Sequence, residues 1–403
     1  MRIARAKAQT AREVGLRLMK IACVHQGYEL YGSDRCFAES VAALRETFPM
    51  AEIEVVLPRT GPIVAALAPH ASRIVFEPLF VLRRKTLARL ALTAPLALPL
   101  ALLRAARRFA RADLVYINTS VLIDYQLAAR AFPAKALLHI HEIPTGAARA
   151  ILRGLALASG AHLIFNSRAT RDSFAPPPGR SQEIIYNGVD APAEPEPTTY
   201  DGARRLRVAL VGRINRIKGQ DVLLAALARL TPEVRARVEV RIVGGAFENP
   251  ALEAQLRADV EASGLAVSVE PFVADAAPVY RWADIVAAPS KLPESLGRTA
   301  IEAMAFGRPA LVSAIGGLTE VIADGETGWH VPPGDADALA QRLATIAARP
   351  EDWRDFGRRA RLRYEALFSR KAATEALGAA AARVVAREPK AFSRRAALTV
   401  GTR

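Results

Sequence analysis

The chain has 403 residues, of which 51% are hydrophobic, and it carries a formal net charge of +15. This length allows two domains of ordinary size, and the hydrophobic content excludes wholesale disorder. Its two cysteines, Cys23 and Cys36, give neither a disulfide framework nor metal-ligand spacing, so a cytoplasmic protein is expected. The positive charge predicts an acidic partner, which could be nucleic acid, an anionic membrane or a phosphorylated ligand.

The first expected element follows a basic extension, residues 1–18, which lacks the apolar core and cleavage site of a secretory signal. The apolar run Lys20–His25 predicts a buried parallel strand, and a helical pattern follows over Arg35–Arg45. The loop between them contains Gly27 and Gly32 but no G-x-G-x-x-G motif. A strand, a glycine-containing loop and a helix are typical of nucleotide-binding sheets. Gly32 therefore either approaches a ligand or only permits a tight turn.

The segment Arg83–Arg111 holds eight Arg or Lys and no Asp or Glu, around the apolar run Leu90–Leu103. That run is shorter than the roughly 20 residues that span a bilayer, and Pro95 and Pro99 are expected to prevent one continuous helix. The pattern predicts docking on an anionic membrane; the alternative is a solvated basic face over a core helix. Phe109 is the segment's one aromatic residue, which argues against a stacking platform for single-stranded nucleic acid.

Further apolar runs alternate with helical patterns and predict strands at Glu52–Leu57, Leu114–Asn118, Lys135–Ile140, His162–Phe165 and Glu183–Tyr186. Such alternation indicates an α/β fold with a parallel sheet, whose ligands bind beyond the carboxyl ends of the strands. His141 and Glu142 directly follow one of these strands. His141 is therefore a candidate ligand contact, or else an ordinary hydrogen-bonded residue at a strand end.

Residues 191–204 are rich in Pro and acidic residues and are expected to link two domains. Beyond them the α/β pattern restarts, with strands predicted at Leu206–Val211, Val238–Val243 and Ile285–Ala288, and helices ending near Leu230 and spanning Pro250–Ser263. Residues 352–388 form a final helical stretch. Two α/β units in tandem are what an enzyme with a site between twin sheets requires.

The strand at residue 285 is followed by a loop that carries Glu294, and a helix that begins at Arg298 carries Glu302. The backbone N–H groups near Leu296 and Gly297, together with the positive end of the helix, would suit a phosphate. The two carboxylates would suit neutral hydroxyl groups. A single ligand could therefore meet all of these groups.

Two motifs stand out in this half of the chain. The first has Glu294 and Glu302 separated by seven residues, with Ser-Leu-Gly after the former, Ala-Met-Ala after the latter, and then Gly-x-Pro, an apolar strand and Gly-Gly-x-x-Glu. The second is Gly212-Arg213, four residues, and Lys218-Gly219. Together they resemble the donor site of retaining glycosyltransferases of family 4, in which Phe is commoner at the position of Leu296.

The resemblance implies the GT-B fold, in which two Rossmann-like domains face each other across a cleft. It implies contacts to the donor diphosphate from Arg213, Lys218, Gly212, Gly32 and the amides at Leu296 and Gly297, to the sugar from Glu294, to the ribose hydroxyls from Glu302, and to a hydroxyl near the reacting carbon from His141 as a hydrogen-bond donor. The expected domains are 19–190 for the acceptor, the linker 191–204, 205–370 for the nucleotide sugar, and 371–403 returning to the N-terminal domain.

The function that we expect is transfer of a sugar, with retention of configuration, from a nucleotide-diphosphate sugar to a saccharide or lipid-linked acceptor. Cell-surface polysaccharide or glycolipid synthesis at the inner face of the cell membrane would suit it. No cofactor or essential metal is expected, because cations can neutralise the diphosphate. No nucleic-acid partner is expected either. The alternatives are a GT-B epimerase or phosphorylase, and a non-catalytic nucleotide-sugar-binding protein at the membrane.

Overall fold

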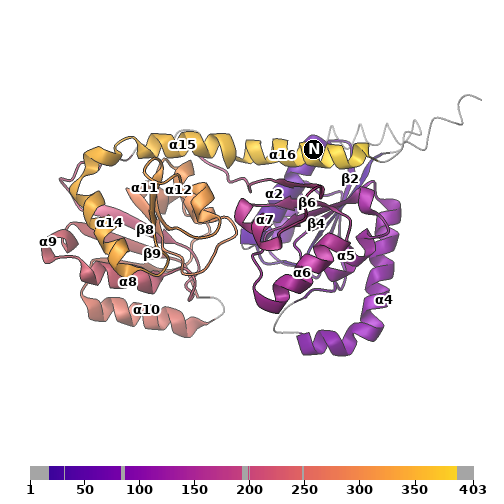
Figure 1. The fold of residues 1–403 in the computed structure, drawn as a ribbon, viewed down its shortest axis with the longest axis horizontal. Helices are drawn as coiled ribbons and strands as arrows, with labels where there is room; N and C mark the ends of the chain where they lie inside the picture. The colour runs from indigo at the N-terminus through magenta and orange to yellow at the C-terminus, as the bar shows by residue number, and fades with distance from the viewer. Residues whose placement is uncertain are drawn as a thin grey trace, which may run out of the picture. The chain divides into compact units, whose positions relative to one another are not determined.

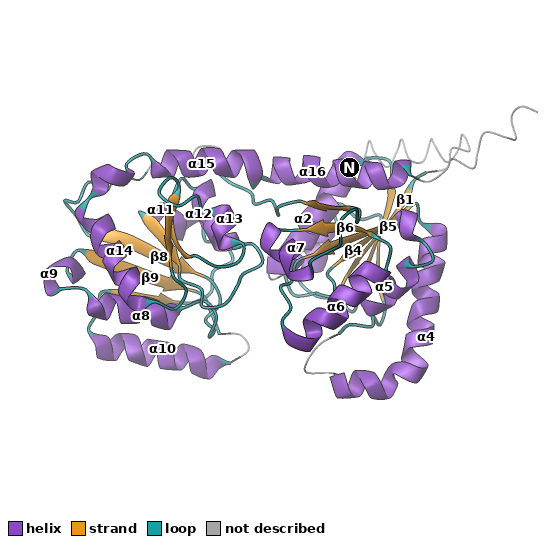
Figure 2. Cartoon of the chain, in the orientation of Figure 1, coloured by secondary structure: helices purple, strands orange, loops and turns teal. Residues whose placement is uncertain are grey.

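The structure is a computed structural model that describes residues 18–30, 32–82, 87–192, 198, 200–246 and 249–387. The described chain divides into two units. The first consists of residues up to Phe165, Phe174–Ile185 and the chain from Thr374 onward, and the second consists of Asn166–Ser173 and Tyr186–Ala373. Each unit is an α/β structure with its own parallel sheet between helices (Figure 2).

The first unit is built on a sheet of seven strands in the order β3-β2-β1-β4-β5-β6-β7. Its elements are β1 (Lys20–His25), α2 (Gly32–Thr47), β2 (Glu52–Leu57), α3 (Ile63–Leu67), β3 (Arg73–Phe76), α4 (Leu87–Arg111), β4 (Leu114–Asn118), α5 (Ile123–Ala129), η2 (Pro133–Lys135), β5 (Ala136–Ile140), α6 (Gly146–Ala158), β6 (His162–Phe165) and β7 (Gln182–Ile184). The order runs outward in both directions from β1 and β4. The carboxyl ends of these two strands are therefore the switch point at which sheets of this kind bind ligands.

Alternate residues of the central strands face opposite sides of this sheet, as the two-residue period of a strand requires. Ile21 and Cys23 of β1 pack with helices α2 and α3 and with the later residues of α16 (Arg370–Ala386). Ala22 and Val24 pack on the other side with α4, α5 and α6. The strands are thus buried on both faces, which explains why they are apolar throughout.

Helix α4 differs from the prediction that Pro95 and Pro99 would prevent one continuous helix, because it runs through both prolines. A proline inside a helix costs about 3 kcal/mol and commonly bends it. Both prolines lie on the exposed side of α4, where the carbonyl groups that lose their donors can face water. The later part of the helix is anchored by buried Phe109 and by Arg108, whose guanidinium donates to Glu54 and Glu77 at 2.6 Å each. Figure 1 shows α4 bent near the end that adjoins the grey trace.

The second unit is built on a sheet of six strands in the order β10-β9-β8-β11-β12-β13. Its elements are α7 (Arg168–Phe174), β8 (Leu206–Val211), α8 (Gln220–Arg229), α9 (Pro232–Arg235), β9 (Val238–Val243), α10 (Pro250–Ser263), β10 (Val267–Glu270), α11 (Ala277–Trp282), β11 (Ile285–Ala288), α12 (Arg298–Ala305), β12 (Ala310–Ser313), α13 (Leu318–Val321), β13 (Gly328–Val331), α14 (Ala336–Ala348), η3 (Pro350–Trp353) and α15 (Phe356–Leu367). In this sheet the strand order runs outward in both directions from β8 and β11, so the carboxyl ends of these two strands form its switch point.

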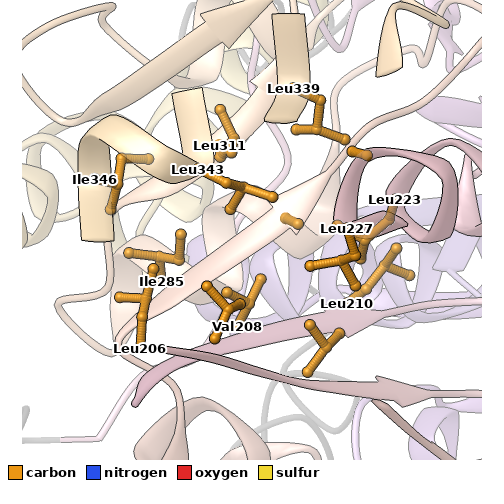
Figure 3. Close-up of a cluster of buried hydrophobic side chains, with 14 of the residues drawn as sticks. Leu206, Val208, Leu210, Leu223, Leu227, Ile285, Leu311, Leu339, Leu343 and Ile346 are labelled. Atoms are coloured by element: carbon orange, nitrogen blue, oxygen red, sulfur yellow. The ribbon is translucent and has the colours of Figure 1, made fainter. Parts of the chain in front are cut away.

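Leucine and isoleucine side chains fill one face of this second sheet. In Figure 3, Leu206 and Val208 of β8 lie against Ile285 of β11, and helices α8 and α14 supply Leu227 and Leu343 from above. These side chains are almost completely buried. They fix β8 and β11 as neighbours, and so bring together the loops that follow the two strands.

The helical stretch expected over residues 352–388 is divided into η3, α15 and α16. The break lies at Phe368 and Ser369, where the chain pairs with Val189: the Val189 N–H donates to Phe368 O at 3.0 Å, and Arg370 N–H donates to Val189 O at 3.2 Å. A helix cannot continue through residues whose backbone groups are used in this way.

Candidate functional site

The loops after β8 and β11 leave the same edge of the second sheet, because the two strands are parallel neighbours. They meet through the backbone, where Lys291 N–H donates to Ile217 O at 2.7 Å. They also meet through an ion pair, in which Lys218 Nζ lies 2.7 Å from Glu294 Oε2. The structure therefore joins two of the residues that the sequence motifs single out, and it does so at the switch point of the sheet.

Glu294 is a half-buried carboxylate with donors on both oxygens: the Lys218 ammonium contacts Oε2, and the Ser290 hydroxyl donates to Oε1. Burial alone would raise the pKa of Glu294, but Lys218, Ser290 and the more distant charge of Arg213 together hold this pKa below its ordinary value. Arg213 itself is exposed beside this group, one residue after Gly212 at the end of β8. Lys218 and Arg213 thus lie beside one ionised carboxylate at this edge.

The start of α12 is placed at the same edge by Gly297 and Thr299. Gly297 is the N-cap residue and has a φ of +92°, a left-handed conformation that favours glycine, while the Leu296 side chain before it is buried. The Thr299 hydroxyl donates to Val211 O at 3.0 Å and so ties the first turn of α12 to the end of β8. Since no side chain caps this helix, the positive end of its dipole favours an anion at this edge.

Glu302 lies one turn farther along α12 and has partners of its own. Arg298 Nε donates to Glu302 Oε1 at 2.9 Å, and the Tyr280 hydroxyl donates to Oε2 at 2.6 Å. Burial and the neighbouring carboxylate raise the pKa of Tyr280 well above its usual value, so this hydroxyl stays protonated. The carboxylate is held in one orientation and keeps lone pairs for further hydroxyl donors.

In the first unit, the corresponding switch point holds His25 at the end of β1, Asn118 at the end of β4 and His141 just after β5. His141 Nε2 lies 2.9 Å from Asn118 Oδ1, and Asn118 Nδ2 lies 2.9 Å from His25 Nδ1. Gly32 begins α2; it has no left-handed φ, and an added Cβ would contact nothing within 4 Å. Neither a left-handed backbone nor a lack of room for a side chain therefore explains why position 32 is glycine.

Several polar residues at these edges were not selected from the sequence: Ser290, Tyr280, His25, Asn118 and Asp34. Two of them could have been selected from the sequence, because His25 and Asn118 are the last residues of predicted strands. The order of the strands, which makes those two ends neighbours, cannot be read from the sequence pattern. Ser290 and Tyr280 gain their meaning only from the folding of the loops around Glu294 and Glu302.

Within the described ranges, no group of three or more His, Cys, Asp or Glu side chains could hold a metal ion. None of the described helices is both long and apolar enough to cross a membrane.

Residues 205–349, within the second unit, match the family described as "Glycosyl transferases group 1". Among curated proteins, the chain is similar to D-inositol 3-phosphate glycosyltransferase of Kribbella flavida, with 36% identity over 181 residues, which are 43% of this chain and 42% of the relative. The chain thus matches less than half the length of that relative.

Two solved structures resemble the chain over most of its length. One is that of Anabaena Alr3699/HepE in complex with UDP and glucose, with a TM-score of 0.73 and 23% identity, covering 90% of this chain and 99% of that one. The other is that of a glycosyltransferase from Rickettsia africae, with a TM-score of 0.76 and 18% identity, covering 92% and 100%. With its two parallel sheets, the chain has the GT-B fold class that the sequence predicted.

Proposed function

Since residues 205–349 match the group 1 glycosyltransferases, we propose that the protein transfers a sugar from a nucleotide-diphosphate sugar to an acceptor. One observation carries the proposal: Lys218 and Glu294 meet 2.7 Å apart at the β8/β11 switch point, beside Arg213 and the uncapped start of α12. Cations and the positive end of a helix are suited to a diphosphate, and ionised carboxylates are suited to sugar hydroxyls.

The proposed roles follow from this geometry. Arg213 and Lys218 neutralise the diphosphate, with help from the backbone at Gly212, Leu296 and Gly297. Glu294 accepts from hydroxyls of the transferred sugar, and Glu302, oriented by its bonds to Arg298 and Tyr280, accepts from the ribose. From the first unit, His141 contacts a sugar hydroxyl, and the loop ending at Gly32 approaches the diphosphate.

In the reaction, the bond between the anomeric carbon and the phosphate oxygen breaks, and a bond from that carbon to the acceptor oxygen forms on the same face. The acceptor proton passes to the departing phosphate oxygen, so the products are the glycosylated acceptor and the nucleoside diphosphate. Negative charge gathers on the diphosphate as the bond breaks, and two fixed cations stabilise it there. Because Arg213 and Lys218 supply this charge, we propose that no metal ion is essential.

We further propose that the acceptor is a saccharide or lipid-linked saccharide and that the protein docks on anionic membranes through α4. An exposed row of leucines, the α4 leucine stripe, runs along this helix and consists of Leu92, Leu96, Leu100 and Leu103. Leu92 and Leu96 are 83% and 82% exposed. Exposed Arg107 and Arg111 continue the same helix toward its end. An apolar face with neighbouring cations suits the interface of an anionic bilayer.

The described structure changes which cations can take part in docking. Arg108 is turned inward to Glu54 and Glu77, so it is not available to lipid. Arg83, Arg84 and Lys85, the first three cations of the segment, lie outside the described residues. Docking is therefore attributed to the leucine stripe together with the remaining cations of the segment.

Screening a panel of nucleotide-diphosphate sugars for binding and slow hydrolysis tests the proposed transfer. We expect at least one donor to bind and to release its nucleoside diphosphate. Product analysis with and without a saccharide acceptor separates the alternatives, because an epimerase changes the sugar without an acceptor and a phosphorylase requires inorganic phosphate. A protein that binds donors but never turns one over would be the non-catalytic alternative.

A further inference from the structure

Four side chains of the first unit form a continuous chain of hydrogen bonds, which we name the Asp34 chain. Asp34 Oδ1 lies 2.8 Å from His25 Nε2, His25 Nδ1 lies 2.9 Å from Asn118 Nδ2, and Asn118 Oδ1 lies 2.9 Å from His141 Nε2. The first three of these residues are buried, and His141 is half-buried. The chain therefore connects a buried carboxylate on α2 to the imidazole that follows β5.

The hydrogen bonds of the Asp34 chain all run in the same direction, from donor to acceptor. Both oxygens of Asp34 accept, one from His25 and the other from Leu30 N–H at 2.8 Å. His25 thus carries its proton on Nε2, and its Nδ1 accepts from the Asn118 amide; a second contact, from Nδ1 to the Asn118 carbonyl, is longer at 3.4 Å. The Asn118 oxygen is then turned to His141, which must donate from Nε2.

We propose that the Asp34 chain holds His141 in the Nε2–H tautomer and turns its Nδ1 lone pair outward as a hydrogen-bond acceptor for a hydroxyl of the bound sugar. Asp34, His25 and Asn118 are then positioning residues. This role for His141 rests on the proposed function. It differs from the role that the family resemblance implies, because here the imidazole accepts the hydrogen bond from the sugar and does not donate it.

The second nitrogen of His141 supports this role. Nδ1 has no hydrogen-bond partner in the part of the chain that the structure describes. Burial, and to a smaller extent His25, lower the pKa of His141 to about 3, so that the ring is neutral and keeps its lone pair at working pH. The ring of His139 lies 4.0 Å away, centroid to centroid, and holds the imidazole plane, while Tyr116 OH adds a 3.1 Å contact to Asn118 Oδ1.

The loop over Asp34 supports the chain from the other end. A Cβ on Gly27 would lie 1.8 Å from Asp34 Oδ1 and 2.7 Å from His25 Nε2, so the backbone passes directly over this pair and only glycine fits. Leu30, whose N–H binds Asp34, has a φ of +104°, which is unfavourable for a leucine. Strained backbone persists where its surroundings require it, and here it serves the carboxylate at the start of the chain.

Nitrogen NMR of the 15N-histidine-labelled protein tests the proposal directly, because the two neutral tautomers of an imidazole give different nitrogen shifts. In the wild type we expect His141 to be protonated on Nε2; a proton on Nδ1 would overturn the proposal. In Asp34→Asn, the new amide oxygen remains with Leu30 N–H, so its NH2 group faces His25. Each bond in the chain then reverses, and His141 should become the Nδ1–H tautomer. An unchanged tautomer in folded Asp34→Asn would also overturn it.

The matched control is Glu183→Gln, which alters another histidine–carboxylate pair of the same sheet, in which His162 Nε2 lies 2.6 Å from Glu183 Oε1. It should leave the tautomer of His141 unchanged. In Asp34→Asn, kcat/KM for the donor should fall about tenfold or more, since the acceptor offered to the sugar has become a donor. Affinity for the free nucleoside diphosphate should change much less, because most of its proposed ligands lie in the second unit and the new amide oxygen still binds Leu30 N–H in the loop before Gly32.

The outcomes separate this inference from the proposed function. If the tautomers behave as expected while no nucleotide sugar is bound or turned over, the Asp34 chain stands and the transferase proposal fails. If sugar is transferred while the tautomer in folded Asp34→Asn does not change, the transferase stands and the Asp34 chain fails.

Discussion

At the scale of single residues, the two glutamates of the donor motif occupy different environments although they are near in sequence. Glu294 is bound to Lys218 and Ser290, whereas Glu302 is bound to Arg298 and Tyr280. The sequence spacing identified both carboxylates. Ser290 and Arg298 each lie four residues before the glutamate that they bind. Lys218 and Tyr280 could not be predicted as partners, because they lie in the loop after β8 and on α11, which only the folded sheet brings to these glutamates.

Replacing each glutamate by glutamine should separate their roles. Glu302→Gln should weaken binding of the free nucleoside diphosphate by about tenfold or more, because a charged acceptor for ribose hydroxyls is lost. Glu294→Gln should bind the nucleoside diphosphate at least as tightly as wild type, because Lys218 is freed from its ion pair, but should turn over donor slowly. Titration calorimetry, with exposed Glu326→Gln as the control, measures the affinities. The reverse pattern would exchange the two assignments.

The neutral state of His141 predicts a dependence of stability on pH. Its pKa is about 3 in the folded protein, against an ordinary value of about 6.5. Between these values the unfolded chain binds a proton that the folded chain does not, so this group makes the wild type more stable as pH rises from about 4 to 6.5. The contribution is fully present above about pH 6.5 and is lost as the pH falls.

Urea unfolding of the wild type and His141→Gln between pH 4 and 7 measures this effect. The difference in unfolding free energy should shift in favour of the wild type by up to about 1.4 kcal/mol per pH unit over that window. Glutamine can keep the bond to Asn118 Oδ1, so packing is largely preserved. A difference that does not vary with pH would mean that folded His141 titrates normally.

At the scale of elements, the interior strands were predictable, whereas three of the four edge strands of the described sheets were not. Continuous apolar runs marked β1, β2, β4, β8 and β9, which are buried by neighbours on both sides and by helices on both faces. The strands that were missed, β3, β10 and β13, all lie at sheet edges. β3 and β10 are only partly buried, so their sequences need no apolar run, and in β13 Gly328 and His330 interrupt one.

For helix α4, the two prolines led us to predict a break that the structure does not have. Its partners outweigh the local cost: Phe109 is buried, and Arg108 is paired with two glutamates. The same helix then exposes its leucine stripe, which a reading of charge alone undervalued.

Substitution of the α4 leucine stripe should abolish membrane docking. Leu96→Glu with Leu100→Glu should greatly reduce co-sedimentation with vesicles that contain anionic lipid, because apolar contact is lost and the new charges repel the surface. Leu362→Glu, which changes an exposed leucine of α15, should bind as the wild type does. Wild-type binding should also fall with salt and require anionic lipid. If the double variant sediments like wild type, α4 is not the docking element.

At the scale of the whole molecule, both units place polar side chains at the switch point of a parallel sheet. In the first unit these are His25 and Asn118, and in the second they are Lys218 and Glu294. The predicted ends of the strands indicated approximately where these polar side chains lie. The identity of the neighbouring strands decides which residues meet, and it follows from the packing of helices against both faces of each sheet.

The central claim is that the charges at the β8/β11 edge bind a nucleotide-diphosphate sugar and stabilise its departing diphosphate. The most direct test is the rate at which nucleoside diphosphate is released from a donor by the wild type, Lys218→Ala and Lys291→Ala. Lys291, on the loop after β11, pairs at 2.6 Å with Asp221 in the first turn of α8, which makes it a matched control. We predict a loss of about a hundredfold in Lys218→Ala, the scale of one preorganised electrostatic contact, with the control near wild type and the melting temperature of each variant little changed. Release by Lys218→Ala within a few fold of the wild-type rate would contradict the account.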